Sequence, residues 1–446
     1  MPASNYLAAP NDIENQIKPL ETSLYEELVC LSPLSSSCCI NIVPYHMRVK
    51  NEQAYTPKVV SIGPLHHGND AFKAMEEHKK RYLSDYLDRT KVHVEDYIKR
   101  IRQQEARLRD CYAETIELSR DEFVRMVAVD AAFLIELLIR FEKKDFQRDG
   151  DRLFGNPNLF YDVRPDLFLL ENQLPFFILE NVFDLYTRGI EGVVHSRRAT
   201  NELLVEICTN FIFALVGGEP SKKEHSLALI RGTDMTRLQH FVDLIYIVCR
   251  QPFGARSRGK PDSLIIPTIT ELHHAGVEFK TTPNKTKLFD LGIEFSFSDG
   301  VLIIPNFVLN LTMGDITLNM IAYEQCYVPR LYLSDCVTLI KDLVRTPGDV
   351  ELLVDKGVVT NLFSTNEMAS TLINDLAQGV RFNTADFIYA TLCNDLNKYC
   401  RMRRHKWMAT LRQDYFNTPW TTISVVAAAF VIILTLIQTV CTVASC

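Results

Sequence analysis

The sequence predicts a mainly α-helical body with a small β element, followed by one C-terminal transmembrane helix. Apolar residues recur at helical spacing over most of the chain. Asp299-Gly300 separates two short apolar runs, as in a β-hairpin. No charged side chain occurs in 418–446. Composition is ordinary for a globular protein, with 47% hydrophobic and 23% charged residues among 446. We therefore expect a large folded part and a membrane anchor.

Residues 1–24 are predicted to be a disordered, polar tail, and 25–417 an α-rich soluble domain. The first residues include Asp12 and Glu14, and they lack both a long apolar run and a basic leading region. They therefore do not resemble a secretory signal peptide. The segment 251–263 is basic, contains Gly and Pro, and has no apolar periodicity. It is predicted to be an exposed loop or a linker between two lobes.

Helical periodicity marks the elements of the body. The segment 75–118, rich in Lys, Arg and Glu, predicts a long exposed helix or a helical pair. The segment 123–141 is apolar but punctuated by charges, which is typical of a core helix in a soluble protein. Further helices are predicted at 175–187, 200–216, 235–250, 314–325, 333–345, 348–356 and 365–378. A last long helix is predicted to begin near 384, and its continuation into the membrane is one alternative.

A β-hairpin is predicted near 292–304. Ile293, Phe295 and Phe297 alternate on one face of the first run, and the second run is apolar from 301 to 304. An Asp-Gly dipeptide between such runs is a strong hairpin signal, because glycine readily adopts the positive φ of the tight turn. The sequence therefore predicts a small β element within a helical body.

The segment 418–446 is predicted to be a transmembrane anchor. Its apolar run 421–444 would span about 36 Å as a helix, enough for a hydrocarbon core of about 30 Å. A buried core helix is the alternative, but such helices usually carry a polar face. Six basic residues precede the run, and none follows it. They are Lys398, Arg401, Arg403, Arg404, Lys406 and Arg412.

This charge asymmetry predicts which side of the membrane holds the body. Cytosolic flanks of membrane helices carry the excess of Lys and Arg, so we expect the body in the cytosol, at the plasma membrane or the endoplasmic reticulum. The same cations would attract anionic lipid headgroups. The alternative is that they form only the solvated face of a helix.

Charge and cysteine usage exclude some classes of protein. A net charge of -7 does not suit a protein built mainly to bind nucleic acid. The 12 cysteines are scattered and form no C-x-x-C pair. This pattern predicts reduced, mostly buried thiols rather than a zinc site, with disulfides in a lumenal domain as the minority alternative.

No motif for catalysis or for a cofactor is found. The chain lacks the phosphate-binding glycine loops, the nucleophile elbow of hydrolases and the zinc-protease pattern. The segment 145–156 faintly resembles a calcium loop but ends on Asn156 instead of Glu. We therefore predict no cofactor, no metal and no enzyme. Four acids lie in or near apolar stretches and could serve acid–base catalysis in a cleft, or simply bridge helices through hydrogen bonds. They are Asp130, Glu136, Asp166 and Glu171.

Several longer motifs point to a known family. They include Cys39–His46 (CINIVPYH), Tyr55–Gly68 (YTPKVVSIGPLHHG), Leu170–Phe177 (LENQLPFF), Ile321–Cys326 (IAYEQC) and Asp414–Trp420 (DYFNTPW). Over about 39–440 the chain resembles the plant family called domain of unknown function 247, or uncharacterised protein family 0481. One departure is Asp130-Ala131, where related sequences typically have Asp-Gly. The resemblance implies a single C-terminal membrane helix and no established catalytic residues. Some grass members resemble pollen-side determinants of self-incompatibility.

The polar residues of these motifs form a candidate binding notch. Its members are Tyr45, His46, His66, His67, Glu171, Asn172 and Gln173. The alternative is that these groups satisfy the loop backbone inside the fold.

Two classes of function follow. The first is a membrane-anchored recognition or signalling protein that binds a protein partner at the membrane surface, with self-incompatibility and homo-oligomer formation among its roles. The second is a membrane-tethered, hydrolase-like enzyme that uses the buried acids or the adjacent histidine pairs, His66-His67 and His273-His274. A deep pocket where acids and histidines converge would favour the enzyme, and a shallow surface would favour recognition.

Overall fold

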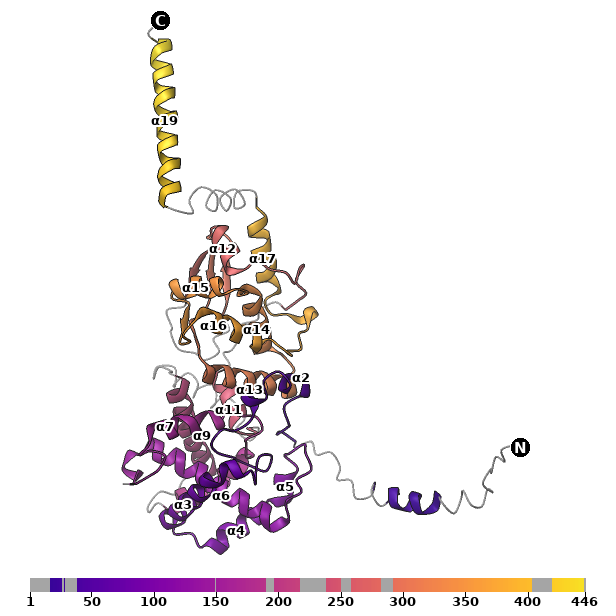
Figure 1. Ribbon diagram of the computed structural model, residues 1–446. Helices are drawn as coiled ribbons and strands as arrows, with labels where there is room; N and C mark the ends of the chain where they lie inside the picture. The colour runs from indigo at the N-terminus through magenta and orange to yellow at the C-terminus, as the bar shows by residue number, and fades with distance from the viewer. Residues whose placement is uncertain are drawn as a thin grey trace, which may run out of the picture.

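The computed structural model describes residues 17–25, 28, 38–148, 150–189, 196–216, 238–249, 258–281, 292–402 and 419–444. Figure 1 shows a body of two lobes, with the earlier part of the chain in one lobe and the later part in the other. The prediction of a mainly helical body with small sheets is confirmed. Within the predicted tail, 1–24, residues 1–16 lie outside the described residues, and residues 17–25 form a helix. Ile17, Leu20 and Leu24 share one face of that helix, at spacings of three and four residues.

The N-terminal lobe is built around helix α6 (Arg120–Glu142). A capping box between Ser119 and Glu122 starts this helix, and most of its side chains are buried. It packs against its neighbours on several sides. The helices of this lobe are α2 (Tyr45–Arg48), α3 (Lys73–Thr90), α4 (Val94–Arg102), α5 (Glu105–Arg109), α6, α7 (Pro157–Asp166), α8 (Phe176–Gly189), α9 (Arg197–Val216) and α11 (Phe241–Cys249). The predicted core helix at 123–141 is confirmed.

The predicted segment 75–118 is three helices, not one or two. Helix α3 ends where Lys91 adopts a left-handed conformation with φ of 58°. Helices α4 and α5 are separated by a short turn at Gln103 and Gln104. Periodicity alone did not reveal these breaks because the apolar spacing continues across them.

The C-terminal lobe combines short helices with two small sheets. Its helices are α12 (Ile269–His274), α14 (Tyr332–Leu343), α15 (Pro347–Asp355), α16 (Asn366–Leu376) and α17 (Ala390–Arg401). Its strands are β1 (Glu278–Lys280), β2 (Glu294–Ser296), β3 (Val301–Ile303), β4 (Phe307–Leu309) and β5 (Val359–Asn361). Strands β2 and β3 pair antiparallel across a turn that ends at Gly300, so the predicted hairpin is confirmed. The parallel pairs β1–β3 and β4–β5 were not predicted.

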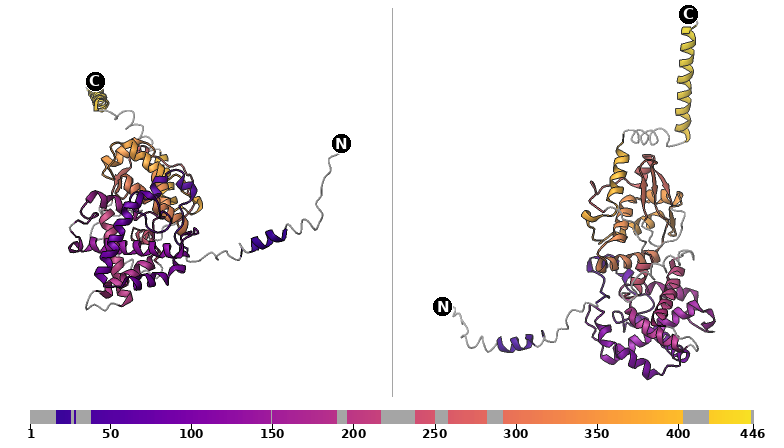
Figure 2. Two further views of the ribbon diagram at one scale, coloured as in Figure 1. Left: turned by 60° about the horizontal axis from the view of Figure 1, so that its bottom comes forward. Right: turned by 180° about the vertical axis from the view of Figure 1, so that it is seen from behind.

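Helix α13 (Leu311–Tyr327) lies between the two lobes (Figures 1 and 2). It contacts α7 and α11 on one side and α14 and α16 on the other. The Asn319 side chain accepts a hydrogen bond from Leu170 N at 3.0 Å and donates one to Ala54 O at 2.7 Å. The buried residues of both lobes form one continuous hydrophobic core. Of the predicted loop or linker at 251–263, residues 251–257 lie outside the described residues.

The last two helices differ from the prediction. Helix α17 begins at Ala390, not near 384, and ends at Arg401, because Met402 is extended with ψ of 132°. It therefore does not continue into α19 (Pro419–Ala444). Judged on the described residues, none of the helices combines the length and the apolarity that a membrane crossing requires. The described large apolar side chains of α19, from Ile423 to Val440, are each more than half exposed.

Candidate functional site

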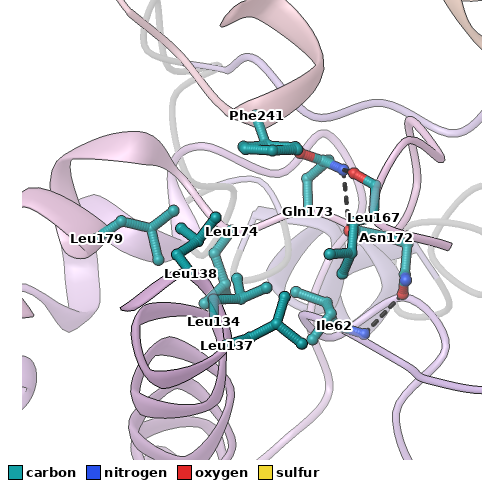
Figure 3. A pocket seen from close by; sticks show the side chains of 10 residues that line it. All are labelled: Ile62, Leu134, Leu137, Leu138, Leu167, Asn172, Gln173, Leu174, Leu179 and Phe241. Atoms are coloured by element: carbon teal, nitrogen blue, oxygen red, sulfur yellow. Dashed lines mark hydrogen bonds between the residues drawn. The ribbon is translucent and has the colours of Figure 1, made fainter. Parts of the chain in front are cut away.

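Glu171, Asn172 and Gln173 form a buried polar junction between α7 and α8, here called the polar junction. Asn172 is at its centre. Its Oδ1 accepts a hydrogen bond from Ile62 N at 2.6 Å. Its Nδ2 donates to Val60 O and to Asp166 O, each at 2.9 Å. One amide thus fixes two backbone segments that are far apart in the sequence. Figure 3 shows its hydrogen bond with Ile62 N.

The Gln173 side chain also forms hydrogen bonds with the backbone. Its Nε2 donates to Leu167 O and Leu169 O, at 2.9 and 2.8 Å, and its Oε1 accepts from Val242 N at 3.3 Å. Its backbone oxygen accepts a hydrogen bond from the Tyr112 hydroxyl at 3.0 Å. Gln173 therefore joins the loop before α8 to the start of α11.

Glu171 holds the N-terminal segment of the body. It accepts hydrogen bonds from Val43 N at 2.6 Å and from the Arg48 guanidinium. His66 Nε2 lies 3.4 Å from its second oxygen. Burial alone would raise the pKa of Glu171, but the nearby His66 imidazole and the hydrogen bonds from Arg48 and Val43 N hold that pKa below its ordinary value. The ionised form is the one that these donors stabilise.

Gly63 allows the backbone to approach the polar junction closely. Its φ is +76°, and a Cβ at this position would lie 2.5 Å from Gln173 O. Any other residue would both clash with that carbonyl and strain the backbone. Gly63, which precedes Pro64 in a turn-forming dipeptide, is thus also required for packing.

The predicted notch is only partly assembled. Glu171, Asn172, Gln173 and His66 come together, and their described hydrogen bonds go mainly to loop backbone, as in the alternative interpretation of these residues. Tyr45 is 80% exposed on the short helix α2. His46 Nε2 and His67 Nδ1 are buried atoms without a hydrogen-bond partner among the described residues. A ligand for this surface remains a prediction.

Asp130 is paired with a buried lysine. Lys79 Nζ lies 2.5 Å from Asp130 Oδ1 and donates to Ser61 O at 2.8 Å, while Asp130 Oδ2 accepts from Gly63 N at 2.8 Å. Burial alone would lower the pKa of Lys79, but the adjacent Asp130 and Glu76 carboxylates raise it above its ordinary value. Lys79 is therefore charged, and the pair anchors the segment 61–63 on α3 and α6.

Glu136 belongs to a second buried network, centred on Arg140. The Arg140 guanidinium donates to Glu136 at 3.0 Å, to Asp151 at 2.6 Å and to Asp85 at 2.5 Å. Arg89 also binds Glu136, and the Tyr82 hydroxyl binds Asp151. In the sequence, Arg140 is only one of the charges that punctuate the apolar segment 123–141. Its role as the centre of the network depends on partners from two other segments, Asp85 on α3 and Asp151 after α6.

Asp166, the last residue of α7, binds the backbone that precedes the segment held by Asn172. Its carboxylate accepts hydrogen bonds from the backbone of Lys58, Val59 and Val60, at 2.9, 2.7 and 2.8 Å. Burial raises the pKa of Asp166 to about 6, against the opposing effect of these donors. All four acids singled out in the sequence are thus bound to structural partners.

A small cavity adjoins the polar junction (Figure 3). It is lined by Ile62, Leu134, Leu137 and other apolar side chains, together with Asn172 and Gln173. Its volume is about 20 Å³, room for about one water molecule. This cavity is too small for an organic substrate.

The described residues contain no group of three His, Cys, Asp or Glu side chains arranged to hold a metal ion. Of the predicted basic cluster, Lys398 and Arg401 are exposed near the end of α17. Arg403, Arg404, Lys406 and Arg412 lie outside the residues that the structure describes.

We expect the folding stability of the protein to depend on pH because of Asp335, in the C-terminal lobe. Burial raises its pKa to about 7, although Ile388 N donates to it at 3.1 Å and Arg258 lies 3.9 Å away. Glu324 and Asp386 also face it and oppose its ionisation. Because the folded pKa is above the ordinary value, the folded state binds the proton more tightly, and stability falls as pH rises from about 4 to about 7.

We expect Asp335→Asn to flatten this part of the pH profile. The variant should match the parent near pH 4 and exceed its melting temperature above pH 7, since Asn cannot ionise. Thermal unfolding between pH 4 and 8 measures the difference. Asp88→Asn, at an exposed position, is the control and should leave the profile unchanged. An unaltered slope in Asp335→Asn would show that other groups cause it.

Comparisons with known proteins agree with the resemblance seen in the motifs. The family model described as "Plant protein of unknown function", DUF247, matches residues 40–434. The chain is 28% identical to UPF0481 protein At3g47200 of Arabidopsis thaliana, over 90% of this chain and 85% of that one. It is 22% identical to the Arabidopsis thaliana protein called Putative UPF0481 protein At3g02645, over 89% and 88% of the two chains. No solved structure is significantly similar.

Proposed function

This chain belongs to the DUF247 family of plant proteins, and from that premise we propose that it is a membrane-anchored recognition or signalling protein. Its helical body binds a protein partner at the membrane surface, on the cytosolic side. Recognition of the self-incompatibility type is one role within this proposal.

The main observation in favour of an anchor is the exposed apolar surface of α19. Phe430, Ile432 and Leu434 are 65, 60 and 51% exposed, and the other described large side chains of this helix are similar. Leaving such surface in water is unfavourable by about 25 cal/mol per Å². A bilayer would cover the helix on all sides. The basic residues before it, including the exposed Lys398 and Arg401, favour a cytosolic body.

A second apolar surface supports the orientation of the body in this proposal. Leu264 and Ile265 are 53 and 74% exposed. They are held beside α17, since Asp262 N donates to Asn394 Oδ1 at 2.8 Å and Asn397 Nδ2 donates to Ile265 O at 3.2 Å. Helix α17 is the last described element before α19. The end of the body that carries this apolar pair therefore faces the bilayer.

The state of the buried acids favours recognition over the hydrolase-like alternative. Acid–base catalysis needs carboxyl groups that can reach a substrate. Asp130, Glu136 and Asp166 are instead buried, and each is bound to a lysine, an arginine or backbone donors. We therefore assign these acids to the stability of the body.

Deleting 418–446 is expected to convert an integral membrane protein into one that sodium carbonate extracts. The reason is that the exposed apolar surface of α19 is removed while the core of the body is intact. Fractionation of plant-cell membranes, with the full chain as the reference, measures the change. The truncated protein should keep its cooperative unfolding transition. A truncated chain that stays in the carbonate-resistant pellet would rule out α19 as the sole anchor.

Affinity capture of the full chain from detergent-solubilised membranes tests the recognition role. A protein partner should be recovered at constant stoichiometry and should survive mild washing. The Lys80→Met variant, altered at an exposed site of α3, is captured in parallel as the matched control. Recovery of lipid alone, with no stoichiometric protein in repeated captures, would contradict the proposal.

A further inference from the structure

Cys39 and Cys111 lie side by side where the start of the body meets the end of α5. Ile40 forms a parallel β-bridge with Tyr112. Ile40 N donates to Cys111 O at 2.9 Å, and Ala113 N donates to Ile40 O at 3.0 Å. In a parallel bridge the preceding residues are also opposite each other, which places Cys39 beside Cys111. Consistent with this register, Cys39 N also donates to Cys111 O at 2.9 Å.

This register suits a disulfide. Paired backbone segments lie about 4.8 Å apart, and disulfides join residues whose Cα atoms are about 4.4–6.8 Å apart. Both residues are only 4% exposed, and both carry free thiols. The Cys39 thiol hydrogen-bonds to Cys111, which lowers the pKa of Cys111 and raises that of Cys39. Cys111 is therefore the better nucleophile of the two.

A third thiol gives solvent a route to the pair. Cys38 precedes Cys39 and is half-buried, with its Sγ 3.6 Å from Asn41 Oδ1. It is close enough to Cys111 for the two thiols to interact electrostatically. An oxidant can therefore reach Cys38 without prior unfolding of the lobe.

We propose that Cys39 and Cys111 are a redox modification site, which a small-molecule disulfide such as oxidised glutathione converts to an intramolecular disulfide. The Cys38 thiolate attacks the glutathione disulfide and releases one glutathione. The Cys111 thiolate displaces the second glutathione from Cys38, and Cys39 then attacks the Cys111 sulfur and releases Cys38. In total, two thiols lose two protons and two electrons, and one glutathione disulfide becomes two glutathione molecules.

The disulfide would stabilise a junction of three segments, those that contain Cys39, Cys111 and His240. Besides its pairing with Cys111, Cys39 accepts a hydrogen bond at its backbone oxygen from His240 Nε2, at 3.0 Å. His240 is itself buried at the start of α11. A covalent link would close residues 39–111 into a loop, which limits the unfolded chain and so stabilises the N-terminal lobe. This inference does not depend on the membrane anchor.

The test uses the full chain in detergent. The protein is incubated with oxidised glutathione, its remaining thiols are blocked with N-ethylmaleimide, and it is digested without reductant for mass spectrometry. We expect a peptide containing Cys39 linked to one containing Cys111, lost on reduction, and a higher melting temperature for the oxidised protein. Cys111→Ser should abolish every such link and the thermal shift. Cys39→Ser should stop the exchange at the Cys38–Cys111 disulfide, which fragment ions place on Cys38.

Two further variants distinguish the residues involved. Cys38→Ser should slow formation of the link but leave the same product, and Cys208→Ser, at a thiol buried elsewhere, should change nothing. Abolition of the link by Cys38→Ser, or fragment ions that place the bond of the unsubstituted protein on Cys38, would assign the bond to Cys38 and overturn the proposal. Recovery of Cys39 and Cys111 as separately alkylated peptides after oxidation would equally contradict it.

Discussion

Replacing Lys79 by Met is expected to destabilise the N-terminal lobe by about 3–5 kcal/mol, the usual cost of breaking a buried ion pair from one side. The lysine is fully buried, and its ammonium contacts Asp130 and Ser61 O. Met fills the space of the side-chain stem but leaves the Asp130 carboxylate without its counter-charge. Urea unfolding, followed by circular dichroism, measures the loss.

Two controls separate the ion pair from other effects of the substitution. Lys80→Met changes the neighbouring, exposed lysine and should alter stability by no more than about 0.5 kcal/mol. The double variant Lys79→Met/Asp130→Leu leaves no fully buried charge unpaired, since Glu76, the other partner of Lys79, is partly exposed, so part of the lost stability should return. If the double variant loses more stability than the two single variants lose together, the unpaired charge is not the cause of the loss.

Asn172→Asp is expected to cost about 3 kcal/mol or more at neutral pH. The substitution keeps the shape of the side chain and its acceptor for Ile62 N. It replaces two donated hydrogen bonds with a carboxylate oxygen facing Val60 O and Asp166 O. Each unsatisfied buried group costs about 1–3 kcal/mol, and the introduced charge adds repulsion. Thermal and urea unfolding both report the change.

The pH dependence identifies the cause of this loss. The two carbonyl groups disfavour ionisation, so the introduced carboxyl should titrate above its ordinary range, and the destabilisation should shrink as pH falls. Asn69→Asp is the matched control. Asn69 is exposed and its Oδ1 accepts from Ala71 N, which a carboxylate can also do. A loss in Asn172→Asp that does not vary with pH would indicate a packing defect instead.

The elements with strong local signals were predictable from the sequence. Helix α6 has a capping box and a long apolar pattern, and the β2–β3 hairpin has Asp299-Gly300. Strands β1, β4 and β5 have three residues each, too few for an alternating pattern. Their parallel pairing also depends on partners distant in sequence, which local patterns do not encode.

The sequence predicted where the polar junction lies but not which backbone groups its side chains bind. The run Glu171-Asn172-Gln173 before Pro175 indicates buried or functional polar groups, and backbone satisfaction was one of the two interpretations. Nothing in the sequence indicates that Asn172 binds the backbone at Val60 and Ile62. Arg140 is a similar case, because its partner Asp85 lies on another helix. Such pairings follow only from the packing of α3 on α6.

The polar junction also sets the order in which a nascent chain can fold. Val43 and Ile62 are made 128 and 110 residues before Glu171 and Asn172, the side chains that hold them. At a synthesis rate of about 5–20 residues per second, the first segment leaves the ribosome roughly 5–20 s before its partners are translated. During that interval the segment that is buried in the finished lobe stays open to proteases and chaperones. We therefore expect ribosome-bound chains that end before residue 171 to be cleaved rapidly between 43 and 63, and longer chains to be protected there.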